Sequence, residues 1–149
     1  MTEEKYYQEW FKKAEQDLKA AKILLEFDDM YDTVAFHCQQ AAEKYLKGYL
    51  IYQGTSIRKT HDLTVLCKMC AVYDEGFMNF FDDCKFLTVF YNEVRYPLYE
   101  VNEKITKNEA EKAFSAANKI KEFILDQVKC KRGRLTRKSK SSPLFFVLF

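Results

Sequence analysis

Glycine and proline are scarce in this chain, at four and two of 149 residues. Folds built from many short strands need these residues at their turns, so their scarcity favours long helices over a sandwich or barrel. No apolar run approaches the ~20 residues that a membrane-spanning helix requires. Hydrophobic residues make up 48% and charged residues 31%, which are ordinary values for one globular domain and exclude wholesale disorder.

Several sequence motifs with known chemistry are also missing. Neither GxxxxGK[ST] nor GxGxxG occurs, so a bound nucleotide would have to meet side chains or helix ends. Cys67 and Cys70 have CxxC spacing, but a structural zinc site normally takes four ligands and no second CxxC exists. We therefore expect no metal and no cofactor, and we interpret both thiols as buried packing.

The cysteine count and the N-terminus bear on the compartment. The five cysteines are an odd number, and the acidic, polar opening MTEEKYYQEW lacks the features of a secretion signal. Reduced thiols are usual in the cytoplasm. We therefore expect a cytoplasmic protein without a membrane span.

Charge divides the chain into two parts. Residues 129–149 hold seven Lys or Arg and no acid, while the preceding part carries all 22 acidic residues and 17 of the 24 basic ones. We predict a helical domain over residues 1–130 and a basic, then apolar, tail over 131–149. The tail is either a disordered end, which we favour, or an arm for nucleic acid or an anionic membrane.

Apolar residues recur at helical spacing along most of the domain. This periodicity predicts helices over residues 2–27, 32–52, 60–73 and 74–95, and a further helix that opens with a capping box at TKNE, residues 106–109. Pro97 should end the fourth of them near Arg95. Short connections between helices favour an all-α, antiparallel up-down bundle of four to five helices.

Arg95 is the first candidate binding residue, because a guanidinium between tyrosines can hold a phosphate while the rings stack on a base. Tyr91, Tyr96 and Tyr99 flank it in the sequence, and we expect Tyr96 or Tyr99 to stack on the base. The alternative is an ion pair between Arg95 and a nearby acid. His61, at the start of the third predicted helix, is placed either to meet an anion or to form a structural hydrogen bond.

Three stretches resemble the HEPN domain family over about residues 3–130. They are WFKKAEQDLKAAKILL (10–25), FHCQQAAEKYLKGYL (36–50) and THDL (60–63). The resemblance implies an up-down helical bundle, often a homodimer. It also implies a role beside nucleotides, since some members lie next to minimal nucleotidyltransferases and others are RNA-cleaving toxins.

The RNase members of that family carry an R-φ-x-x-x-H motif, which this chain does not preserve. Arg95 matches the Arg and Tyr96 the φ position, but Glu100 stands in place of the His. Imidazole shuttles protons near neutral pH, whereas a carboxylate would need a considerably raised pKa to replace it. An RNase would therefore use Arg95 and Glu100, with His61 supplied from another helix.

The polar half of the second predicted helix has two interpretations. Gln40, Glu43, Lys44 and Lys47 fall close to one face, where two ammonium groups could hold a phosphate or a Glu-Lys pair could lie in solvent. Our leading hypothesis is a non-catalytic nucleotide- or substrate-binding module, homodimeric, beside a separately encoded nucleotidyltransferase. One alternative is a metal-independent endoribonuclease with a degenerate site, the toxin of a HEPN/nucleotidyltransferase toxin-antitoxin pair. The other is a protein-interaction bundle without a small ligand. The predicted binding residues are Lys44, Lys47, His61, Arg95, Tyr96 and Tyr99.

Overall fold

The computed structural model describes residues 3–93 and 104–139, and all regular structure within them is helical. This confirms the predicted all-α class. The elements are α1 (Glu3–Leu24), α2 (Tyr31–Tyr52), α3 (Leu63–Ala71), the 3₁₀ helix η1 (Glu75–Phe80), α4 (Phe81–Thr88), α5 (Phe90–Glu93) and α6 (Lys107–Ser139).

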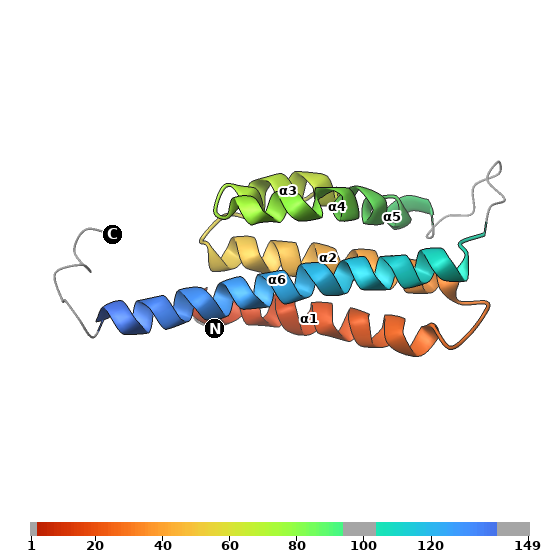
Figure 1. Ribbon diagram of the computed structural model, residues 1–149, viewed down its shortest axis with the longest axis horizontal. Helices are drawn as coiled ribbons and strands as arrows, with labels where there is room; N and C mark the ends of the chain where they lie inside the picture. The colour runs from red at the N-terminus through yellow and green to blue at the C-terminus, as the bar shows by residue number, and fades with distance from the viewer. Residues whose placement is uncertain (1–2, 94–103, 140–149) are drawn as a thin grey trace.

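Helix α2 is the central element of the bundle. It contacts all five other α-helices: α1 lies on one side of it, α3, α4 and α5 lie on the other, and α6 runs along it and contacts both α1 and α4 (Figure 1). A helix enclosed in this way must bury most of its circumference, and α2 does so even at polar positions. Its polar residues therefore have to find partners inside the protein.

Small residues let α1 and α2 approach closely. Ala14, Ala21 and Ala41 are fully buried. A Cβ at Gly48 would lie 2.7 Å from Cε1 of Phe11, closer than real Cβ atoms come to carbon. Glycine at this position is thus a packing requirement of the α1–α2 contact.

Two helix ends have recognisable capping motifs. At the end of α2, Gly54 has φ 81°, and the Thr55 N–H donates to the Leu50 carbonyl at 2.9 Å, as in a Schellman motif. At the start of α6, the Thr106 N–H donates to Glu109 Oε2 at 2.9 Å, and the Glu109 N–H donates to Thr106 Oγ1 at 3.2 Å. The predicted capping box is confirmed.

The prediction of one continuous helix over residues 74–95 is wrong. Asp74 caps the 3₁₀ helix η1 through the Gly76 N–H, and α4 and α5 follow separately. In a 3₁₀ helix, side chains three apart eclipse each other. Phe77 and Phe80 accordingly both contact the Phe123 ring of α6, at centroid distances of 4.9 and 5.0 Å. Packing against a distant helix therefore favours the tighter winding.

Other helix boundaries also differ from the predicted ones. Helix α1 ends at Leu24, because the Phe27 N–H bonds to the Leu24 carbonyl in a turn. Helix α3 begins at Leu63 and not at residue 60, because Asp62 caps it by accepting from the Thr64 N–H. Helix α6 continues beyond residue 130 to Ser139, into the segment expected to be disordered. The domain division at residue 130 stays a prediction.

Candidate functional site

A row of polar side chains is buried on α2. Gln39, Glu43 and Lys47 lie one turn apart and are 0%, 5% and 6% exposed. Burying a charge is costly unless it is paired and hydrogen-bonded. Lys47 Nζ lies 2.8 Å from Glu43 Oε1, and Gln39 Nε2 donates to Glu43 Oε2 at 3.0 Å. The row therefore satisfies much of its own hydrogen-bonding capacity.

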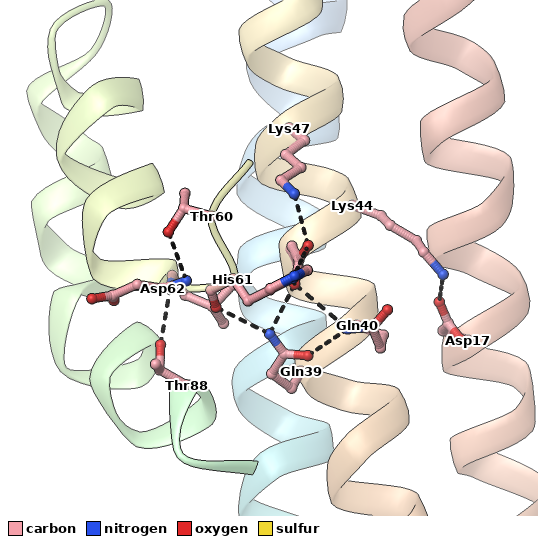
Figure 2. A network of polar contacts seen from close by, with 11 residues as sticks. Asp17, Gln39, Gln40, Lys44, Lys47, Thr60, His61, Asp62 and Thr88 are labelled. Atoms are coloured by element: carbon pink, nitrogen blue, oxygen red, sulfur yellow. Dashed lines mark hydrogen bonds and ion pairs between the residues drawn. The ribbon is translucent and has the colours of Figure 1, made fainter. Parts of the chain in front are cut away.

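The segment that precedes α3 crosses this row and brings His61 onto it (Figure 2). His61 Nδ1 lies 3.0 Å from Glu43 Oε1 and 3.2 Å from Oε2, and the His61 carbonyl accepts from Gln39 Nε2 at 3.3 Å. Just beyond it, the Leu63 N–H donates to Thr88 Oγ1 at 3.0 Å. Both the backbone and the ring of His61 are thus held between α2 and the start of α3.

The rest of the His61 ring is partly exposed and partly covered by one aromatic ring. Its side chain is 48% exposed, and the ring stacks on Tyr91 of α5 with centroids 3.9 Å apart and an interplanar angle of 13°. Within the described part of the chain, no hydrogen-bond partner contacts Nε2. The arrangement combines a half-exposed imidazole with a fixed ring position, which suits the binding of an anion or a hydroxyl.

Lys44 points away from this site, toward α1. Its Nζ lies 2.5 Å from Asp17 Oδ2, while His37 Nδ1 lies 2.9 Å from Asp17 Oδ1. Burial of the Asp17 carboxyl acts to raise its pKa, but the hydrogen bonds from His37 and Lys44 outweigh burial and leave the pKa lowered. Lys44 and Lys47 therefore pair with different acids and do not form one phosphate-binding face.

The structure describes only part of the predicted binding set. It places Lys47 and His61 beside Glu43, and Lys44 beside Asp17. Arg95, Tyr96, Tyr99 and Glu100 lie outside the described residues. Sequence reasoning missed Gln39 and the central place of Glu43. The available signal was their spacing: polar residues at 39, 43 and 47 recur every fourth position in an apolar helix.

The cysteines pack as expected. Cys67 and Cys70 are fully buried, and their thiols donate to the carbonyls of Phe77 and Leu46. Burial raises the pKa of the Cys70 thiol, which makes it a poor nucleophile. Among the residues that the structure describes, no group of three His, Cys, Asp or Glu side chains could hold a metal ion, and no helix could cross a membrane.

The site lies in an all-helical bundle whose central helix, α2, buries a polar row beside His61. The family model for the HEPN domain matches residues 7–128, and the chain belongs to that family. This confirms the resemblance seen in the sequence.

Known proteins resemble the chain over most of its length. A Methanocaldococcus jannaschii protein named "Putative toxin MJ1304" is 30% identical over 141 residues, which cover 87% of this chain and 92% of that protein. The crystal structure of TT1696 from Thermus thermophilus matches with a TM-score of 0.67 and 27% identity, over 80% of this chain and 96% of that one. The archaeal HEPN homologue ST0689 matches with a TM-score of 0.68 and 28% identity, over 82% and 97%.

Proposed function

We propose that this chain is a non-catalytic HEPN module that binds a nucleotide, or a nucleotide of RNA, at the exposed edge of His61. The observation that supports this is the His61 ring itself. It is half exposed, anchored through Nδ1 to a buried carboxylate and stacked on Tyr91. Burying the Glu43–Lys47 pair and Gln39 costs free energy of desolvation, and an exposed histidine needs no such support to lie in solvent. The presence of the row therefore favours a binding role for the His61 ring.

The ligand would lie on His61 and not on the lysines. Lys47 is buried against Glu43, and Lys44 is bound to Asp17, so each would have to leave an acid to reach a phosphate. We assign phosphate binding to His61 together with Arg95, which follows Tyr91 by four positions in the sequence. Tyr96 or Tyr99 would stack on the base.

The partners we propose follow from family membership. The module would act as a homodimer beside a separately encoded minimal nucleotidyltransferase. Sedimentation at tens of micromolar protein tests the dimer, and a monomer at that concentration would contradict it. Co-purification tests the partner.

The direct test is thermal unfolding of the full chain with millimolar ATP, GTP, AMP or a short RNA. A ligand at ~100 times its dissociation constant adds ~2.7 kcal/mol, which moves the midpoint by several degrees. The shift should vanish in Arg95→Ala and in His61→Ala. His37→Ala is the matched control, because His37 also binds a carboxylate through Nδ1 but on the α1 side. No shift with any ligand would favour a protein-interaction bundle.

A second candidate function is a metal-independent endoribonuclease toxin, which the name of the M. jannaschii relative favours. The sequence has Glu100 where the RNase motif has His, and the imidazole of His61 would supply the missing proton acceptor. RNA cleavage that is lost in both Arg95→Ala and His61→Ala, and kept in His37→Ala, would establish it. Absence of cleavage at high enzyme concentration would leave the binding module.

A further inference from the structure

The hydrogen-bond partners of Gln39 and Glu43 determine which groups donate and which accept. The His61 carbonyl can only accept, so the Gln39 atom 3.3 Å from it is the amide nitrogen. The same nitrogen faces Glu43 Oε2, and the Gln39 oxygen faces Gln40 Nε2 at 2.8 Å. The orientation of Gln39 is therefore fixed by its neighbours.

Glu43 is an acceptor toward every neighbour. The Lys47 ammonium and the Gln39 amide donate to its two oxygens, and Gln40 Nε2 approaches Oε2 at 3.5 Å. A carboxylate only accepts hydrogen bonds, and here an ammonium and amide N–H groups donate to it. The remaining neighbour, His61 Nδ1, must then donate an N–H to it.

We infer that Glu43 is a positioning residue that keeps a proton on Nδ1 of His61 and so makes Nε2 the nitrogen that meets the ligand. This inference rests on the proposed function for the identity of the ligand. Neutral His61 then offers a lone pair at Nε2, which accepts from a ribose hydroxyl. Protonated His61 offers an N–H, which donates to a phosphate. Both groups belong to a ribonucleotide, which is the ligand class that this site fits.

Glu43 acts through His61 and does not touch the ligand itself. Its side chain is 7% exposed, whereas that of His61 is 48% exposed. Two contacts together fix the ring: the Glu43 hydrogen bond sets its rotation, and the Tyr91 stack sets its plane. A carboxylate that orients a working imidazole through its other nitrogen is a recurrent device in enzymes and metal sites.

Nitrogen NMR of the full chain tests the tautomer without any ligand. The chain has only two histidines, so His37→Asn leaves one set of imidazole signals to assign. In the neutral imidazole of His61, Nδ1 should show the signal of a protonated ring nitrogen and Nε2 that of an unprotonated one. The reverse pattern in the wild type would overturn the inference.

A variant tests whether Glu43 is the cause. Glu43→Gln combined with Lys47→Met keeps the shape of the row without leaving a buried ammonium unpaired. In this variant the two tautomers should mix, and affinity for AMP should fall about tenfold while His37→Asn binds normally. An unchanged tautomer in the double variant would overturn the role of Glu43. The expected tautomer without binding of AMP or RNA to the wild type would contradict the proposed function but support the positioning by Glu43.

Discussion

The imidazole of His61 lies almost parallel to the ring of Tyr91, with the ring centroids 3.9 Å apart, while its Nδ1 atom meets a buried carboxylate. Tyr91 belongs to α5 and Glu43 to α2, so one exposed side chain joins the central helix to the neighbouring α3–α5 layer. Any ligand at Nε2 would therefore meet a ring whose position is already set. Such preorganisation reduces the entropy lost on binding.

The buried pair in the α2 row should be costly to break. Lys47→Met leaves the Glu43 carboxylate without its cation, and we expect a loss of about 3 kcal/mol in the free energy of unfolding. Glu43→Gln in the same chain should restore most of it, because the uncompensated charge is then gone. Urea unfolding of the two single variants and the double variant measures the coupling. Additive effects would contradict a direct pair.

Gly48→Ala should destabilise the α1–α2 contact. The added Cβ would lie 2.7 Å from the Phe11 ring, so the helices must separate or Phe11 must leave its rotamer. Overpacking of this kind costs about 1–3 kcal/mol, more than the gain in helix propensity from alanine. Ser115→Ala, at an exposed position of α6, is the control and should change stability by less than about 0.5 kcal/mol.

Asp17 should make stability depend on acid pH. Its pKa is lowered in the folded protein, so the unfolded chain takes up the proton more readily. The stabilisation is present above the ordinary Asp value of about 3.9 and is lost as the pH falls below it. Unfolding of wild type and Asp17→Asn between pH 7 and 3 checks this: the difference between them should shrink below about pH 4. A constant difference would show that the charge of Asp17 contributes nothing.

One thiol should react in the native protein. Cys130 is exposed, whereas Cys38, Cys67, Cys70 and Cys84 are buried. Burial raises the pKa of Cys38 to about 12, which leaves almost no thiolate at neutral pH. A colorimetric thiol reagent should modify about one cysteine rapidly and the others only in denaturant. Loss of the rapid phase in Cys130→Ser confirms the assignment, and its persistence would contradict the packing of the core.

The fold could be predicted from the sequence because it depends on periodicity and local caps. The spacing of Ala14, Leu18 and Ala21 places α1, and the Thr106–Glu109 capping box places the start of α6. The split of the segment 74–95 could not be predicted, since it depends on Phe123, far away in the sequence. Helix propensity depends on the local sequence and does not reflect contacts with residues distant in the chain.

The candidate site was harder to predict for the same reason. His61 was identified from its position at the start of a helix, but its partner Glu43 looked like half of a surface Glu-Lys pair. The segment that precedes α3 packs over the Glu43–Lys47 pair and buries it, and Glu43 then contacts the His61 ring. This packing is visible only in the folded protein. Lys44 shares the sequence motif with Lys47, yet it lies on a different face of α2 and pairs with Asp17 on α1.

The most direct measurement of the central claim is a titration of nitrogen-labelled protein with AMP and a short RNA, following the ring nitrogens of both histidines. The His61 Nε2 signal should move with saturation, while the signals of His37, bound to Asp17, stay in place. Unchanged signals of His61 at millimolar ligand, or equal movement of both histidines, would contradict a ligand site at the exposed edge of His61.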